Sequence, residues 1–262
     1  MKKFLSVFCV ATLALSLVAC GQKDTPASVE PEVEASVEAS VEASVEASVE
    51  ASVEEADEAA VAVMSYAEYA AADMDSDVVV EFTVQAHQSW WDDKITVYGA
   101  DEDGAYFVYN MACSEEDAAK LDSNVVIRVT GTKTQWSGEV EIADATFEIV
   151  DDATPYVAVA KDATDLLGQD SLVDLQNQLV SFTDMEVTAV SYKNNEPGDD
   201  IYVNLKKGDY EYYFCLEYYL NGSDEEFYNL VGNLEVGSIV DVESFLYWYE
   251  GPNGHLTKVT VK

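Results

Sequence analysis

The chain has 262 residues, and its 51 acidic residues outnumber its 13 basic ones to give a formal net charge of −38. Such a charge repels phosphate and anionic lipid surfaces, so it predicts that nucleic acid is not a partner. Divalent cations, cationic peptides and neutral sugars are compatible with it. About 200 residues follow position 60, which is enough for one large or two small domains.

The N-terminus, MKKFLSVFCVATLALSLVACGQ, has the pattern of an export signal. Lys2 and Lys3 precede an apolar run (4–18) that is too short for a settled membrane-spanning helix. The run ends in LVACG (17–21), which resembles the lipobox of bacterial lipoproteins. The resemblance implies removal of residues 1–19, acyl chains such as palmitate on Cys20, and anchoring to the outer face of the cell membrane. The alternative is an ordinary secretory signal with a chance cysteine.

Residues 20–60 read as a linker that carries the lipidated cysteine. Five EASV tetrads occupy positions 34–53, and a period of four residues lets the valines drift around a helix without forming a stable face. Positions 21–60 hold 12 acidic residues and one lysine, so self-repulsion should extend the segment. We expect a disordered tether, with transient helix as the alternative.

The first half of the remaining chain is rich in strand-forming residues and turn signals. Val80, Phe82 and Val84 alternate with polar residues, as in a half-buried strand. A short helix is expected over 114–121, with Ser114 as its N-cap and Asp117 three residues later. The expected strands are 78–87, 94–100, 105–112, 125–131 and 140–150.

The second half repeats this order of elements. Its helix is expected over 223–234, with Ser223 as the N-cap and Glu226 completing a capping box. The expected strands are 179–190, 201–209, 210–220, 238–249 and 255–262. Three strands, a helix and two more strands is the order of the OB-fold, a five-stranded Greek-key barrel. We therefore predict a mainly β protein with two tandem OB-like barrels, domain 1 over 61–152 and domain 2 over 153–262. A generic β-sandwich is the alternative.

The segment SYAEYAAADMDSDVVVEFTVQA (65–86) resembles the short helix and first strand that open many extracellular OB domains. On these residues the chain is similar to cell-surface lipoproteins of Gram-positive type that carry OB-like domains. The resemblance covers residues 64–150 well and 165–262 more loosely. It implies a fold and a location, and it transfers no catalytic residue.

An aromatic ligand groove is expected on domain 1, because OB-folds bind across strands 2 and 3 and between loops 1-2 and 4-5. Trp90 and Trp91 fall on the first of these loops and Trp136 on the second, while Tyr98 and Tyr106 are expected on the groove floor. Exposed indoles stack on sugar rings or bases and grip cations. The alternative is that these tryptophans close the barrel ends as part of the core.

The second half holds a weaker version of this pattern. Trp248, Tyr249 and Tyr192 occupy the equivalent loops, where we expect core packing. Cys113 and Cys215 lie one in each half without CxxC spacing. We expect two buried thiols, and an inter-domain disulfide is the alternative.

Signals for catalysis, metal binding and cofactors are weak. The only histidines are His87 and His255, in different halves, and no motif for a nucleophile elbow, zinc, phosphate or dinucleotide site occurs. We therefore expect no enzyme activity, no metal and no cofactor. The predicted function is a membrane-anchored binding or adaptor module for a saccharide or cell-surface glycan. A protein-interaction or structural surface module and, less strongly, a hydrolase are the alternatives.

Overall fold

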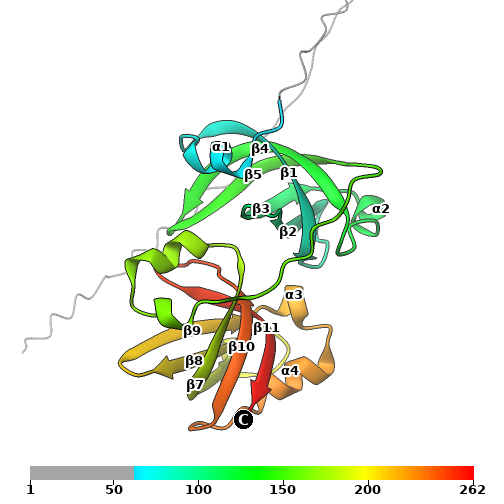
Figure 1. Ribbon diagram of the computed structural model, residues 1–262. Helices are drawn as coiled ribbons and strands as arrows, with labels where there is room; N and C mark the ends of the chain where they lie inside the picture. Colours follow the sequence, from blue (N-terminus) through cyan, green and yellow to red (C-terminus); the bar gives the residue numbers. More distant parts are fainter. Residues whose placement is uncertain (1–61) are drawn as a thin grey trace, which may run out of the picture. The chain divides into compact units, whose positions relative to one another are not determined.

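The computed structural model describes residues 62–262, which are mainly β and form two sheets (Figure 1). The predicted signal (1–19), Cys20 and the predicted linker (20–60) lie outside the described residues.

The first sheet closes into a barrel with the strand order β1-β2-β3-β5-β4. Its β3–β5 pair is parallel and its other pairs are antiparallel. This arrangement confirms the predicted OB-like barrel. The elements are β1 (Ser76–His87), β2 (Lys94–Ala100), β3 (Ala105–Ala112), α2 (Glu115–Ala118), β4 (Val126–Trp136) and β5 (Glu139–Ile149).

The alternation predicted for β1 is confirmed, although the strand begins two residues earlier than expected. Val80, Phe82 and Val84 are buried in the barrel core, where they help to remove apolar surface from water. On the outer face, the carboxylate of Glu81 lies 3.1 Å from the guanidinium of Arg128 on the neighbouring strand β4.

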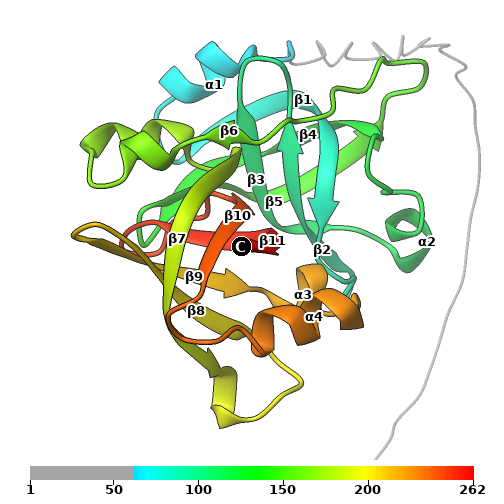
Figure 2. The ribbon, with the colours of Figure 1, turned by 60° about the horizontal axis from the view of Figure 1, so that its bottom comes forward.

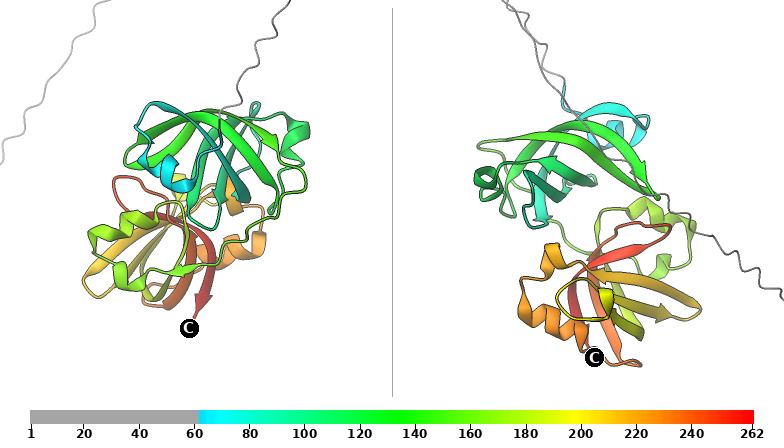
Figure 3. Two further views of the ribbon diagram at one scale, coloured as in Figure 1. Left: turned by 45° about the horizontal axis from the view of Figure 1, so that its top comes forward. Right: turned by 180° about the vertical axis from the view of Figure 1, so that it is seen from behind.

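Helix α1 (Tyr66–Ala71) packs against the first barrel, as Figure 3 shows. A capping box between Ser65 and Glu68 starts it, since each side chain accepts a hydrogen bond from the other residue's backbone N–H. Lys133 ends it: the buried ammonium donates to the carbonyls of Tyr69, Ala70 and Ala72 at 2.8–3.0 Å. The last carbonyl groups of a helix have no N–H partner within the helix, and here a lysine on β4 donates to them.

The second sheet repeats the strand order of the first. Five of its six strands follow the order β7-β8-β9-β11-β10, and an additional β10–β7 pairing closes them into a ring. The β9–β11 pair is parallel, as β3–β5 is in the first barrel. The strands are β6 (Lys161–Asp162), β7 (Leu179–Tyr192), β8 (Ile201–Lys207), β9 (Tyr210–Leu216), β10 (Ile239–Phe245) and β11 (Asn253–Val261).

The helices of the second barrel differ from the sequence prediction. The strand expected over 210–220 ends at Leu216, and α3 (Tyr218–Asn221) follows it. Helix α4 (Glu225–Gly232) is capped by Asp224, whose carboxylate accepts the N–H of Phe227 at 2.9 Å. The predicted Ser223 cap and its capping box are therefore wrong, because the neighbouring aspartate offers a carboxylate one position closer to the helix.

The segment between the barrels is hydrogen-bonded to the outer face of β1. Thr83 and Gln85 accept the backbone N–H groups of Tyr156 and Ala158 at 2.8 and 2.9 Å, and the Gln85 amide donates to the Tyr156 carbonyl. The joining segment is thus attached to the first barrel before the chain enters the second (Figure 2).

The β4–β5 turn of the first barrel is hydrogen-bonded to the second barrel. Gln176 accepts from the N–H of Val140 at 3.1 Å and donates to the carbonyl of Gly138 at 2.9 Å. The N–H of Glu250 donates to the carbonyl of Ser137 at 2.7 Å. These bonds satisfy backbone groups that would otherwise need water, and they hold the turn in one position.

Candidate functional site

The face of β2 and β3 on which the groove was expected is covered by the second barrel. Tyr98 and Phe107 form an apolar cluster with Phe245, and the rings of Tyr98 and Phe245 stack at 4.3 Å. The Tyr98 hydroxyl hydrogen-bonds His255 Nδ1 at 2.9 Å, and burial lowers the pKa of this histidine to about 3. Tyr98 is therefore not a groove floor residue, because its side chain is buried in the contact between the barrels.

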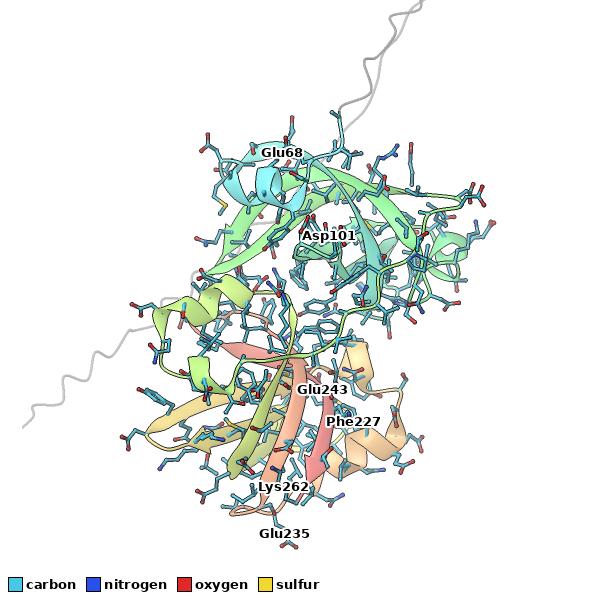
Figure 4. All side chains as sticks on the ribbon, viewed as in Figure 1. Glu68, Asp101, Phe227, Glu235, Glu243 and Lys262 are labelled. Atoms are coloured by element: carbon cyan, nitrogen blue, oxygen red, sulfur yellow. The ribbon has the colours of Figure 1, made fainter. Side chains whose placement is uncertain are left out.

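Tyr106 is also fully buried, but inside the first barrel. Its ring stacks on Phe82 at 5.0 Å and meets Tyr66 of α1 edge-on at 5.5 Å. Its hydroxyl donates at 2.8 Å to Asp101, which lies in the turn between β2 and β3 and is labelled in Figure 4. The expectation that Tyr106 lies on the groove floor is wrong, since the alternation of β3 turns this side chain inward.

Trp90 and Trp91, adjacent in sequence, occupy different environments. The indole of Trp90 packs against the core of the first barrel and donates to the Cys113 carbonyl at 2.8 Å. Trp91 is 76% exposed and lines a pocket of about 230 Å³. That pocket also contains Tyr219 of α3, whose carbonyl accepts the N–H of Ser89 at 2.7 Å. The core alternative thus holds for Trp90 and fails for Trp91.

Trp136, the last residue of β4, is 53% exposed and lines a second pocket, of about 250 Å³. We call this second pocket the junction pocket; its lining is Tyr109, Trp136, Glu141 and Tyr247. Tyr109 comes from β3 and Glu141 from β5, whereas Tyr247 follows β10 of the second barrel. The structure therefore places Trp91 and Trp136 in two separate pockets instead of one groove.

Tyr249, from the turn between β10 and β11, extends the aromatic wall of the junction pocket. Its ring lies 5.1 Å from that of Trp136, and about half of its surface is exposed. Tyr247 is stacked on His255 at 4.5 Å and meets Phe107 edge-on at 5.4 Å. Sequence reasoning missed Tyr109 and Tyr247 and assigned Tyr249 to core packing. These positions become one site only when the two barrels meet.

The junction pocket is acidic. Glu141 is 8% exposed, and burial raises the pKa of its carboxyl. Two residues earlier on the same strand, Glu139 is fully buried, and burial raises the pKa of its carboxyl to about 8. Glu139 accepts the N–H of Trp248 from the second barrel at 2.8 Å. Burial first, and then both of these carboxylates, raise the pKa of the Tyr247 phenol, which lies beside them.

The structure also shows the state of the cysteines, of possible metal ligands and of the acidic surface. Cys113 and Cys215 are buried free thiols, as expected. Within residues 62–262, no group of three or more histidine, cysteine or acidic side chains is placed to hold a metal ion. None of the described helices is both long and apolar enough to cross a membrane. Much of the acidic surface points to solvent, as Glu68 and Glu235 do in Figure 4.

No protein-family model matches the chain, and no curated protein matches it. Solved structures do match. A murine DNA-binding protein with bound double-stranded DNA is 11% identical, covers 70% of this chain and 96% of its own, and has a TM-score of 0.35. The p204 HINb domain is 15% identical, with 70% and 95% coverage and a TM-score of 0.33. The Ifi202 HINa domain in complex with double-stranded DNA is 14% identical, with 71% and 98% coverage and a TM-score of 0.33.

These matches correct one expectation from the sequence. Net charge led us to exclude nucleic acid as a partner, yet two of these structures hold double-stranded DNA. The exclusion is therefore withdrawn. With identities of 11–15% and TM-scores of 0.33–0.35, the matches carry no argument about what this chain binds.

Proposed function

We propose that this protein is a lipid-anchored, extracytoplasmic binding protein that takes a saccharide of a cell-surface glycan in the junction pocket. The observation that carries the proposal is the exposed Trp136 indole in a pocket with two tyrosines and a carboxylate. Flat aromatic faces pack against the C–H faces of sugar rings, and a carboxylate and phenols can bond sugar hydroxyls.

The walls of the junction pocket are held in place before any ligand arrives. Hydrogen bonds from Gln176 and Glu250 fix the β4–β5 turn next to Trp136, and Glu139 bonds the backbone next to Tyr247. A site whose walls are already ordered loses less conformational entropy on binding. Both barrels together therefore form the proposed binding unit, in place of the groove on domain 1 alone.

The same pocket favours binding over hydrolysis. Glycosidases commonly use two carboxyl groups that flank the scissile bond. The junction pocket is lined by one, Glu141, while Glu139 is fully buried and bonded to the backbone of Trp248. We therefore propose a binding role without catalysis.

Glycan-array and calorimetric binding to the purified protein would test this function. Trp136→Ala should weaken saccharide binding about tenfold, the equivalent of roughly 1.4 kcal/mol for a lost aromatic contact. Trp91→Ala is the matched control, because it removes an equally large exposed indole from the other pocket. Equal losses in the two variants, or none in Trp136→Ala, would contradict a site at the junction pocket.

The lipid anchor is tested separately. Cys20→Ser removes the thiol that the lipobox would acylate, so the protein should leave the membrane fraction or accumulate unprocessed. Fractionation and mass determination of the N-terminus read out the result. A variant that stays in the membrane with a normally processed N-terminus would show that the anchor is not at Cys20.

A further inference from the structure

The junction pocket contains a buried carboxylate that has no basic partner. Glu141 is 8% exposed, and its side-chain hydrogen-bond partner is the neutral Thr134 on β4. None of the ion pairs in the described part of the chain includes Glu141. Removing a carboxylate from water without pairing it costs free energy, and a cationic ligand group could offset that cost.

The groups around Glu141 strengthen its preference for a cation. Glu139 precedes it by two residues on β5, so a second carboxyl group lies close to the pocket wall. The remaining lining residues, Tyr109, Trp136 and Tyr247, are aromatic, and no lysine or arginine lines the pocket. Glu141 is therefore the one charged side chain in the lining, and its charge is negative.

Aromatic rings provide the second attraction for a positive group. An ammonium within about 6 Å of a tryptophan or tyrosine face is attracted by the ring quadrupole, and more strongly when water is excluded. The junction pocket presents three such side chains from both barrels, and Tyr249 packs against Trp136 from the side. The aromatic rings and one carboxylate can surround an ammonium group, because attraction to the rings does not require a fixed hydrogen-bond geometry.

We infer that the saccharide of the junction pocket is an amino sugar, whose ammonium group lies between Glu141 and the aromatic rings while its pyranose ring packs on Trp136. This inference rests on the saccharide-binding function proposed above. A neutral sugar would bond Glu141 but leave its charge uncompensated, and an acidic sugar would be repelled by that carboxylate. The ammonium therefore supplies the one interaction that the pocket lacks.

The decisive measurement compares two oligosaccharides that differ only at nitrogen. Isothermal calorimetry would be run on the purified protein with an oligomer of glucosamine and with the matched oligomer of N-acetylglucosamine, at a pH where the free amine is protonated. We expect the free amine to bind about tenfold more tightly. Glu141→Gln should remove that advantage while leaving the weaker binding of the acetylated oligomer. Glu148→Gln, which neutralises an exposed residue on the same strand, should change neither.

The binding results distinguish a wrong amino-sugar inference from a wrong saccharide-binding function. If both oligomers bind equally and both depend on Trp136, the saccharide function stands and the amino-sugar inference is wrong. If neither binds and no glycan shows dependence on Trp136, the proposed function itself fails. Binding of tetramethylammonium, a cation without a sugar ring, is the third measurement. Trp136-dependent binding of this ion without any binding of the glucosamine oligomer would overturn the amino sugar in favour of another ammonium source. Unchanged unfolding transitions in the variants establish that lost binding is not lost folding.

Discussion

In the first barrel, the outward side chains of β2 and β3, Tyr98 and Phe107, are buried against the second barrel. In the second barrel, the matching strands β8 and β9 carry Tyr202 and Tyr213, whose rings lie 5.2 Å apart. Tyr213 is 38% exposed and Tyr202 is half-buried. OB-folds usually bind ligands on this face. The same strand order therefore produces a packing surface in one barrel and an open surface in the other.

This difference shows that topology determines where a face lies but not what the face does. Once the second barrel covers β2 and β3, the exposed aromatic residues of the first barrel lie at its margins. Trp136 is exposed at the end of β4, next to Tyr249 of the second barrel. The candidate site thus belongs to the junction of the two barrels, and neither half of the sequence contains it alone.

The largest expected effect comes from removing the contact that distinguishes the two faces. Tyr98→Ala should destabilise the protein by about 3–5 kcal/mol, because it empties a fully buried site and leaves His255 Nδ1 without its partner. Tyr202→Ala, at the equivalent open face, should cost less than about 1 kcal/mol. Urea unfolding of both variants makes the comparison. Similar losses in the two would show that the β2–β3 face is not the principal contact between the barrels.

A pH-dependent effect should follow from the buried carboxyl at the junction. The pKa of Glu139 is raised to about 8 in the folded protein, by burial before any other cause, whereas an exposed glutamate titrates near 4.5. Between these two values the folded chain keeps a proton that the unfolded chain has lost. The contribution of Glu139 to the stability of the wild type should therefore fall as the pH rises through this window, and level off above about pH 8.

Glu139→Gln should remove this contribution, while those of Glu217 and His255 remain, and should stabilise the protein on the order of 2 kcal/mol at neutral pH. Glutamine can still accept the Trp248 N–H, and its amide can donate to Asn177 Oδ1. Within residues 62–262, that oxygen and Glu139 Oε1 are both buried without a partner. Urea unfolding between about pH 5 and about pH 8 measures the change, with Glu148→Gln as the control on the same strand. A Gln variant that is less stable at every pH would show that the carboxylate is charged in the fold.

The strand order was accessible from sequence because it depends on local patterns. Alternation in β1 and the position of the helix between the third and fourth strands predicted the mainly β fold and its first closed barrel. The burial of Tyr98 was not accessible, because its position on β2 is outward in a single barrel and only the second barrel covers it. Likewise, Glu139 and Trp248 meet across 109 positions, and no spacing along the chain encodes such a contact.

The sequence pattern predicted the exposure of the tryptophans correctly only where exposure is decided locally. Trp91 follows β1 in a short turn and Trp136 ends a strand, and both indoles are exposed. The Trp90 side chain is not exposed in this way, because its indole donates a hydrogen bond to the Cys113 carbonyl and packs against the barrel core. The partners of Trp136 come from loops of both barrels, so the junction pocket required the packing of the whole folded part.

The smallest expected effect separates the helix caps of the two barrels. In the first, Ser114 accepts the N–H of Asp117 at 3.1 Å, as its sequence spacing predicts. In the second, Asp224 accepts the N–H of Phe227 at 2.9 Å, and Ser223 lies outside the cap. Asp224→Ala should therefore cost about 1 kcal/mol through the lost hydrogen bond and the lost negative charge at the helix start. Ser223→Ala should change the free energy of unfolding by less than about 0.5 kcal/mol, and Ser114→Ala should again cost about 1 kcal/mol. If Ser223→Ala destabilised the protein more than Asp224→Ala, Ser223 would be the N-cap of α4. Both barrels would then cap this helix with serine, as the sequence spacing predicts.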